Sequence, residues 1–306
     1  MRPFLTVYGH VCLDQIMSLE RFPEANTSVD IVEKHRYFGG TGANIATVAA
    51  SLGVPTALVS YVGSDLPDEF RRNMESRGVD LSEVVTVDGY ETSTVMIVTD
   101  EEQNQVAFVY QGPMRDMDDF DLLTARASES SIVHISTGRP GYYLRLMERM
   151  SSYGKEISFD PAQEVHHIWS AETFPRGMSL ADTFFCNANE LRTALRYLGM
   201  ERPEELLGKV KTVINTRGAE GSIAYTADGA RSVPAARPGA IVDPTGAGDA
   251  FRAGFYAGRY YGHPLEECLA YGNAAASFAL EAKGGVGKVP TWEMVEKRAG
   301  PLLAGL

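Results

Sequence analysis

The most informative stretch of this sequence reads Asp243-Pro-Thr-Gly-Ala-Gly-Asp-Ala-Phe-Arg-Ala-Gly254. Its small residues at Thr245–Gly248 predict a flexible turn, and an amphipathic helix is predicted directly after it, over Ala247–Tyr261. Such a turn leaves backbone N–H groups unpaired at the positive end of a helix dipole, a geometry that suits an anion. Asp249 adds a carboxylate that could accept a proton from a hydroxyl attacking a bound phosphate. Taken alone, the pattern fits equally a helix whose start is capped by Asp249.

On both sides of this stretch, short apolar strands alternate with helical patterns. This alternation is typical of a parallel sheet covered by helices, so the sequence predicts an α/β fold. The predicted strands are Phe4–Tyr8, Thr56–Val62, Ile132–Ile135, Glu156–Asp160, Thr183–Cys186 and Thr212–Thr216, with a hairpin of Ser222–Tyr225 and Arg231–Pro234 around Asp228-Gly229. The predicted helices are Gly42–Leu52, Pro67–Arg77, Tyr142–Tyr153, Asn189–Leu198, Pro264–Ala282 and a last one from Thr291.

Two stretches break the alternation. Thr27–Tyr37 follows the first strand, and Val84–Tyr110 predicts three short strands at Val84–Val87, Ser93–Thr99 and Gln105–Tyr110. Their β-branched and aromatic residues suit a small separate sheet that covers a ligand, or edge strands of the main sheet. The pattern alone does not separate these two arrangements. Because no repeat or linker interrupts the 306 residues, one main domain is expected.

A second glycine-rich cluster, Gly39-Gly-Thr-Gly-Ala-Asn44, precedes the first predicted helix. Glycines let a ligand approach the backbone closely, and Asn44 can both donate and accept hydrogen bonds. An ordinary loop before a helix would show the same sequence pattern. The cluster lacks the third glycine of a dinucleotide-binding fingerprint, and Val289 after Gly287-Lys288 excludes a Walker A loop there.

Two further strand ends carry polar residues. Asn215-Thr-Arg-Gly-Ala-Glu-Gly-Ser222 is a glycine-rich turn after a predicted strand, where open α/β sheets bind their ligands. Asn187 and Glu190 follow the Thr183–Cys186 strand, and Glu190 could hold a water-bound Mg²⁺ or serve in a helix cap. A common tight turn explains the first element equally well.

The composition limits the class of protein. Asp and Glu number 40 against 28 Lys and Arg, a net charge of −12, which argues against a nucleic-acid binder. The three cysteines are far apart and form no CxxC pair, so neither a disulfide framework nor a structural zinc site is expected. No run of about 20 apolar residues predicts a membrane span, and the N-terminal apolar run is too short for a signal peptide. A reducing cytoplasm is the expected location.

Taken together, the glycine-rich clusters resemble the signatures of the ribokinase-like (PfkB) carbohydrate kinase family. Gly39–Asn44 and Asp243–Asp249 occur in the family's order, and the second is highly specific. The resemblance covers essentially the whole chain and implies a three-layer α/β/α fold with a mostly parallel sheet. It also implies a single domain over residues 1–306 with a small β-sheet lid, from about 15–38 and 84–111, through which many members form dimers.

The resemblance also implies roles for residues at matching positions. Asp249 corresponds to the catalytic base, and Gly246, Ala247 and Gly248 to the anion hole. The residues that correspond to acceptor-binding positions are Asp14, Gly39, Gly40 and Asn44. The residues that correspond to the nucleotide site are Asn187, Thr216, Gly218, Gly221 and Asn273, with Glu190 acting on Mg²⁺ through water. ATP with Mg²⁺ is thus the expected phosphate donor, and some members bind K⁺ near Asp243 and the Gly284–Lys288 loop.

The acceptor is expected to be a nucleoside. Sugar kinases of the family often show D-x-N-x-R after the Glu156–Asp160 strand, whereas this chain has Asp160-Pro-Ala-Gln-Glu164. That pattern and Phe251-Arg-Ala-Gly254 are similar to archaeal nucleoside kinases and bacterial adenosine kinases, which makes Gln163 a candidate ligand of the nucleoside. A base can stack on aromatic or sulfur-bearing side chains, for which Phe38, Met96, Phe108 and Tyr110 are the candidates. Ordinary packing explains each of them equally well.

The leading hypothesis is therefore a kinase that transfers the γ-phosphate of ATP to the 5′-hydroxyl of a ribonucleoside. A ribokinase or another sugar or sugar-phosphate kinase is the alternative within the family, with Arg36, Arg115 and Arg139 as possible phosphate ligands. A non-catalytic nucleotide-binding regulator is the alternative of another class. Arg252 lies one helical turn after Asp249 and is interpreted as a phosphate contact or as the partner of a nearby acid. His166-His167 is interpreted as surface.

Overall fold

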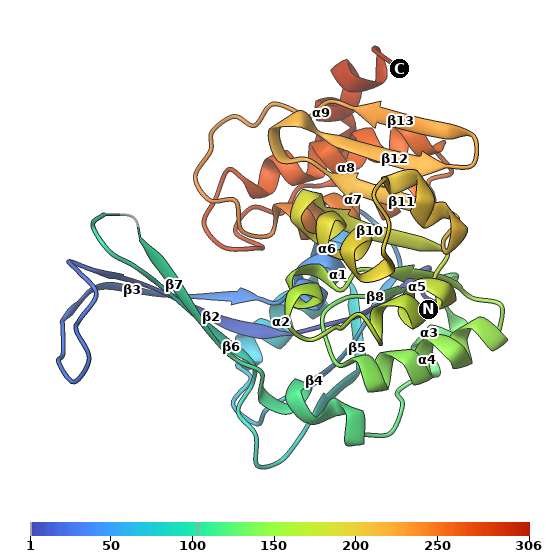
Figure 1. Cartoon of the computed structure of the whole chain (residues 1–306). Coiled ribbons are helices and arrows are strands. Elements are labelled where there is room, and N and C mark those ends of the chain that lie inside the picture. The colour runs from blue at the N-terminus through green and yellow to red at the C-terminus, as the bar shows by residue number, and fades with distance from the viewer. Residues whose placement is uncertain (1, 103) are drawn as a thin grey trace.

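The structure is a computed structural model that describes residues 2–102 and 104–306. Its centre is a nine-stranded sheet with the strand order β13-β12-β11-β10-β9-β8-β1-β4-β5 (Figure 1). The neighbours from β11 to β5 pair in parallel, and β12 and β13 add an antiparallel hairpin at one edge. The strands are β1 (Leu5–Tyr8), β4 (Thr56–Val62), β5 (Val79–Thr86), β8 (Ile132–Ile135), β9 (Glu156–Phe159), β10 (Thr183–Asn187), β11 (Thr212–Thr216), β12 (Ser222–Thr226) and β13 (Gly229–Val233).

Helices cover both faces of this sheet, which gives the expected three layers (Figure 1). Alternate residues of each strand point to opposite faces, so Val7 packs under one helical layer and Tyr8 under the other. The first layer holds α1 (Thr41–Ser51), α2 (Asp68–Ser76), α7 (Ala247–Tyr260), α8 (Leu265–Ala279) and α9 (Trp292–Leu303). The second layer holds α3 (Ala125–Glu129), α4 (Pro140–Ser152), α5 (Phe174–Leu180) and α6 (Ala188–Leu198). Short 3₁₀ turns are present at Gly112–Asp119, Ala162–His166, Pro203–Gly208 and Gly218–Glu220.

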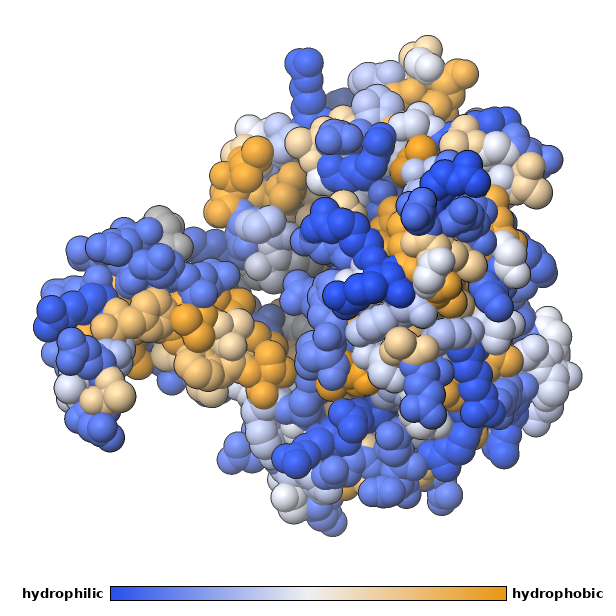
Figure 2. All heavy atoms as spheres, in the orientation of Figure 1, coloured by the Kyte–Doolittle hydropathy of each residue, from blue (hydrophilic) through white to orange (hydrophobic). Residues whose placement is uncertain are grey.

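A smaller four-stranded sheet projects from the main body, and the molecular surface is hollowed where the two meet (Figures 1 and 2). Its order is β3-β2-β6-β7, with antiparallel pairs at both edges and a parallel pair in the middle. The strands are β2 (Cys12–Leu19), β3 (Ile31–Gly39), β6 (Thr94–Thr99) and β7 (Gln105–Tyr110). The small separate sheet expected from the sequence is thus present.

One strand assigned to that small sheet from the sequence belongs elsewhere. The segment Val84–Val87 forms the end of β5, which pairs in parallel with β4 at the edge of the main sheet. Val84 packs in the core of the first layer and Val85 against the core of the second, so a strand buried on both faces was mistaken for a lid strand. The lid boundary at residue 84 is therefore wrong, and the second segment of the smaller sheet begins with β6 at Thr94.

The other predicted strands and helices are found, with ends that differ by a few residues. Several short elements had no strong sequence pattern, namely α3, α5 and the 3₁₀ turns. Among the described residues, none of the helices combines the length and apolar character that a membrane crossing requires.

Candidate active site

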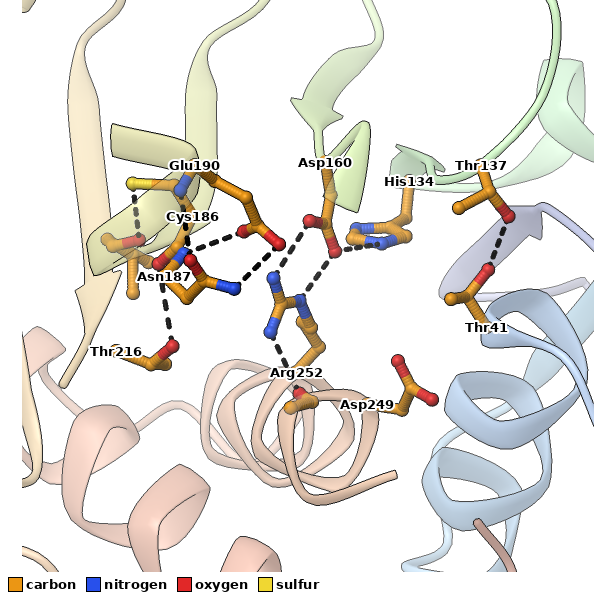
Figure 3. Close-up of polar contacts among 12 residues, drawn as sticks. Thr41, His134, Thr137, Asp160, Cys186, Asn187, Glu190, Thr216, Asp249 and Arg252 are labelled. Carbon is orange, nitrogen blue, oxygen red and sulfur yellow. Dashed lines mark hydrogen bonds and ion pairs between the residues drawn. The ribbon is translucent and has the colours of Figure 1, made fainter. Parts of the chain in front are cut away.

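Polar residues gather where five neighbouring strands of the main sheet end. The strands β11, β10, β9, β8 and β1 are adjacent and parallel, so their carboxyl ends meet at one edge. These ends carry Thr216, Asn187, Asp160, Thr137 and His10. The same edge receives the starts of α1, α6 and α7, which places the three sequence clusters in one region (Figure 3).

The start of α7 is a turn held open by glycine. Gly246 has a φ of 76°, and a Cβ atom there would lie 2.5 Å from the Cα atom of Gly285. Asp243 braces the turn, because its carboxylate accepts hydrogen bonds of 2.9 Å from the N–H groups of Thr245 and Gly284. The N–H of Ala247 donates to Pro244, whereas those of Gly246 and Gly248 have no partner among the described residues. This turn can therefore receive an anion.

Asp249 lies in the first turn of α7 and is partly buried. Its Oδ2 atom accepts a hydrogen bond of 2.8 Å from the side-chain amide of Asn44, in the first turn of α1. Desolvation raises the pKa of Asp249 to about 7, although Asn44 and the Arg252 charge oppose the rise. The carboxylate thus has the basicity that a general base needs near neutral pH, and it joins the two clusters.

Asp14 lies on β2 beside the glycines that precede α1. A Cβ atom on Gly39 would lie 2.1 Å from Asp14 Oδ2, and one on Gly40, whose φ is 95°, would lie 2.4 Å from the His10 carbonyl oxygen. Burial raises the pKa of Asp14 to about 6. Buried oxygens of Asp14 and Asn44 have no hydrogen-bond partner among the described residues. Buried polar atoms without partners call for an explanation, and a ligand that donates hydrogen bonds to them is one.

A polar network missed by the sequence analysis runs beneath this region. His10 Nε2 lies 2.5 Å from Gln111 Oε1, and His10 Nδ1 lies 2.7 Å from Thr137 Oγ1. Gln111 donates to Glu164 at 3.2 Å, and Glu164 also accepts from the Gly138 N–H. The only local signal was the position of His10 directly after the first strand.

Gln163, the predicted nucleoside ligand, is exposed next to this network. It follows Ala162, whose φ of 49° is unusual for a residue with a side chain. That conformation turns the chain between Asp160 and the buried Glu164.

The start of α6 differs from that of α7 because its polar groups bind one another. The side chain of Asn187 accepts hydrogen bonds from the N–H groups of Asn189 and Glu190. In return, the carboxylate of Glu190 accepts 2.7 Å bonds from the main-chain and side-chain nitrogens of Asn187. This is a complete capping box, the structural alternative noted from the sequence. Burial raises the pKa of Glu190, and the Arg252 charge opposes the rise.

The residues assigned to the nucleotide lie on one side of this edge. Thr216 ends β11, and its hydroxyl group lies 3.5 Å from the Cys186 carbonyl oxygen. Gly218 has a φ of 57° with open space around it, and Gly221 has a φ of 91°. The amide nitrogen of Asn273 instead donates to the carbonyl groups of Val233 and Pro234 at 3.1 and 3.0 Å, so this side chain fixes the end of β13.

The residues considered as a wall for stacking a base lie on the face of the smaller sheet opposite Asp14. Residues opposite one another in the register share a face, and Asp14 pairs with Tyr37 and Val95. The other face carries Phe38, Met96, Phe108 and Tyr110. Phe38 stacks on Phe70 of α2 at 4.4 Å between ring centroids, the ordinary packing named as its alternative. The sequence does not reveal which alternate residues of each strand share a face with Asp14, because this depends on the register between strands.

Asp160 and Arg252 form a buried ion pair at the centre of this edge (Figure 3). Arg252 is 5% exposed and Asp160 is 1% exposed. The acid partner proposed for Arg252 is thereby identified, although 92 positions separate the pair in sequence. His166 and His167 are exposed, as expected.

The described residues contain no group of three or more His, Cys, Asp or Glu side chains placed to hold a metal ion. A Mg²⁺ ion carried by ATP does not require such a group, because phosphate oxygens and water supply most of its ligands.

Comparison with known proteins agrees with this geometry. The model of the pfkB family of carbohydrate kinases matches residues 2–292. A nucleoside kinase of Methanothermobacter thermautotrophicus is 36% identical over 295 residues, which is 96% of this chain and 94% of that protein. A nucleoside kinase of Methanocaldococcus jannaschii is 35% identical over 296 residues, 96% of each chain. Its crystal structure, described as an archaeal member of the ribokinase family, superposes with a TM-score of 0.91 over 97% of this chain and 98% of that one, at 34% identity.

The glycine turn before α7, the carboxylate beside it and the layered fold thus agree with the family match along nearly the whole chain. The chain belongs to the pfkB family of carbohydrate kinases, and it is an ATP-dependent kinase that acts on a hydroxyl group.

Proposed function

We propose that this enzyme is a nucleoside kinase that transfers the γ-phosphate of ATP to the 5′-hydroxyl of a ribonucleoside. The observation that carries the proposal is the hydrogen bond between Asn44 and Asp249, which joins the acceptor cluster to the anion turn. The nucleoside as acceptor is supported by two relatives with 35% and 36% identity, both of them nucleoside kinases. The Asp160–Glu164 segment, which departs from the sugar-kinase pattern, supports the same choice.

In the proposed reaction, Asp249 takes the proton of the 5′-hydroxyl as its oxygen attacks the γ-phosphorus in line. The bond between that phosphorus and the bridging β–γ oxygen breaks, and ADP leaves. The anion hole consists of Gly246, Ala247 and Gly248, and the unpaired N–H groups of its two glycines support this role. A pKa of about 7 supports Asp249 as the base for two reasons. A substantial fraction of the side chain is ionised near neutral pH, and its carboxylate is more basic than an ordinary one and so accepts a proton more readily.

The acceptor would bind to Asp14, Gly39, Gly40 and Asn44, with Gln163 toward the base. The unpaired buried oxygens of Asp14 and Asn44 support this assignment, because ribose hydroxyls are suitable donors for them. The smaller sheet acts as a lid over the acceptor with the face that carries Asp14, Tyr37 and Val95. Its opposite face is apolar and exposed and would form the contact in a homodimer; the exposed fractions there are 40% for Val106, 54% for Phe108 and 44% for Tyr110.

ATP would lie over the ends of β10 and β11. Asn187, Thr216, Gly218 and Gly221 would contact it, and Asn273 would support its pocket through the end of β13. Mg²⁺ would be held by the phosphates and, through water, by Glu190; bound there, it neutralises charge that develops on the transferred group. A K⁺ ion beside Asp243 and the Gly284–Lys288 loop would strengthen the turn that these residues brace.

An acceptor panel tests the proposal. Adenosine, inosine, guanosine, cytidine, ribose and fructose 6-phosphate are each supplied with Mg·ATP, and ADP release is measured alongside the phosphorylated product. We expect turnover with at least one nucleoside and a 5′-monophosphate as its product. Turnover with the sugars alone would overturn the proposal in favour of a sugar kinase, and ATP binding without any turnover would favour a regulator. Repeating the assay with Na⁺ in place of K⁺ tests the monovalent cation.

A further inference from the structure

The buried pair Arg252–Asp160 links the catalytic helix to the sheet at the site itself. Arg252 Nε and Nη2 donate to the two carboxylate oxygens of Asp160 at 2.5 and 2.8 Å, and Nη1 donates to the Gly248 carbonyl at 3.0 Å. Arg252 and Gly248 lie on α7, whereas Asp160 directly follows β9. A two-pronged contact of this kind restricts the orientation of both groups more than a single hydrogen bond does.

Neighbouring side chains hold both partners. The guanidinium carbon of Arg252 lies 5.7 Å from the centre of the Phe185 ring, over its face. His134 Nε2 lies 3.3 Å from Asp160 Oδ2, and His134 Nδ1 lies 2.7 Å from the Tyr256 hydroxyl, one turn after Arg252 on α7. Glycine at position 248 makes room for the guanidinium, since a Cβ atom there would lie 3.0 Å from Nη1. The pair is therefore part of a packed polar unit.

The same pair balances charge around Asp249. The groups that act on Asp249 are Asn44 from α1, Asp14 from β2, Asp160 from the end of β9 and Arg252 from α7. Arg252 is the positive charge among them, and it also acts on Glu190 at the start of α6. The Arg252 charge and the hydrogen bonds around Asp160 outweigh the effect of burial and lower the pKa of Asp160 to about 2. Both members of the pair thus stay charged across neutral pH.

A second ion pair provides an internal comparison. Arg259, seven positions further along α7, donates from Nη1 and Nη2 to the carboxylate of Glu156 at 3.0 Å each. Glu156 begins β9, and Asp160 follows its end, so the two pairs join one helix to one strand at opposite ends. If docking α7 were the only requirement, both pairs would serve it alike; only Arg252 also contacts the anion turn, through Gly248.

We propose that Arg252 and Asp160 are positioning residues of the kinase reaction, which fix Asp249 and the anion turn relative to the ends of the central strands. This inference rests on the proposed role of Asp249 as the base. The pair touches neither substrate; it acts by setting where the carboxylate and the glycine N–H groups stand when the γ-phosphate arrives. Small displacements of such groups reduce turnover strongly, by about 10²-fold for about 1 Å.

Arg252→Lys tests the geometry, since it keeps the positive charge and loses the two-pronged contact. We expect kcat to fall by about 10²-fold, with the ATP dissociation constant from calorimetry within about threefold of wild type and an unchanged pH profile. Arg252→Gln removes the charge as well. Its kcat should fall at least as far, and the acidic limb of its pH profile should move upward by about one unit. The double variant Asp160→Asn/Arg252→Gln leaves no unpaired charge and keeps the test possible if the single variant unfolds.

The control is Glu156→Gln/Arg259→Gln, which should keep kcat within about twofold of wild type. Its thermal unfolding midpoint is compared with those of the Arg252 and Asp160 variants. Wild-type kcat in Arg252→Lys and in Asp160→Asn/Arg252→Gln would overturn the inference. So would a loss confined to ATP affinity, which would make Arg252 a phosphate ligand, or an equal loss of kcat in the control. If instead Asp249→Asn retains turnover, the base assignment of the proposed function fails; an inactive Asp249→Asn beside a fully active Arg252→Lys refutes this inference alone.

Discussion

The helices α6 and α7 begin at the same edge of the central sheet, but their first turns are built in opposite ways. At α6, the Asn187 side chain accepts a hydrogen bond from the Glu190 N–H, and the Glu190 carboxylate accepts hydrogen bonds from the main-chain and side-chain nitrogens of Asn187. The helix start is therefore closed by its own residues. At α7, Gly246 adopts a left-handed conformation, and no side chain caps the helix. The N–H groups of Gly246 and Gly248 have no partner within the described ranges, and Asp249 bonds only to Asn44 of another helix.

The difference indicates that the two helix starts have different roles at this edge. A closed helix start is stable without a ligand, whereas an open one is completed by an anion and an incoming hydroxyl group. The start of α1 is built like that of α7: Gly40 has a φ of 95°, and Asn44 extends to Asp249. Substitutions at the start of α7 should therefore lower kcat, whereas substitutions at the start of α6 should change stability and the binding of Mg·ATP with little change in kcat.

The largest expected effect is that of Asp249→Asn, which should lower kcat by at least about 10³-fold with little change in ATP affinity. The folded protein should become more stable at pH 8. Because the pKa of Asp249 is raised from 3.8 to about 7 in the folded state, the carboxylate opposes folding increasingly as the pH rises between these two values, and fully above about pH 7; asparagine removes this penalty. At pH 5 the gain should be smaller than at pH 8, and it should disappear only below the unfolded pKa of 3.8. Turnover assays measure kcat, calorimetry measures the ATP affinity, and thermal unfolding at the two pH values measures the stability. An unaltered kcat would contradict a catalytic role for the start of α7.

Gly246→Ala should be the next most damaging change. A left-handed conformation costs about 1–2 kcal/mol for alanine, and the contact with Gly285 adds to it, so we expect kcat to fall by about 10–100-fold and stability to drop. Gly199→Ala is the matched control. Gly199 ends α6 with a φ of 63° and open space around it, so it should lose only the backbone contribution and retain kcat. Equal kinetic loss in both variants would argue against a special role for the turn.

The pH dependence of wild-type activity should report the ionisation of the Asp249 carboxylate. Asp249 must be ionised to accept a proton, so kcat/KM for the acceptor, which reports the free enzyme, should fall about tenfold per pH unit below its pKa of about 7 and level off above it. Rates at acceptor concentrations well below KM from pH 5.5 to 9 measure the profile. A flat profile across this range would exclude Asp249 as a base with the raised pKa.

The smallest effects should come from α6. Asn187→Ala removes both the cap and the proposed contact with ATP, so it should lower the free energy of unfolding by about 1 kcal/mol and raise the KM for Mg·ATP, with little change in kcat. Glu190→Gln keeps a residue that can complete the capping box, so stability should stay close to wild type. If Glu190 acts on Mg²⁺ through water, this variant should instead raise the KM for Mg·ATP by about tenfold or less. Urea unfolding and initial rates separate the two roles, and a Glu190→Gln variant with normal kinetics would leave only the cap.

Local patterns predicted much of this molecule. The strand–helix alternation located most elements of the main sheet. What they did not predict were relations between distant segments. β5 was assigned to the smaller sheet because a short apolar strand looks the same at the edge of either sheet. That the proposed stacking residues lie on the face opposite Asp14 was also hidden, because strand register sets which alternate residues share a face.

By itself, the sequence determined the α/β architecture and the anion turn with its carboxylate, because periodicity, glycine position and helix start are local properties. Only the tertiary structure decided that Asp249 meets Asn44 and that Arg252 pairs with Asp160. These contacts join residues that are placed by different strands and helices, so they depend on the order of the strands in the sheet. The carboxylate at position 249 is visible in the chain, but the surroundings that raise its pKa exist only in the fold.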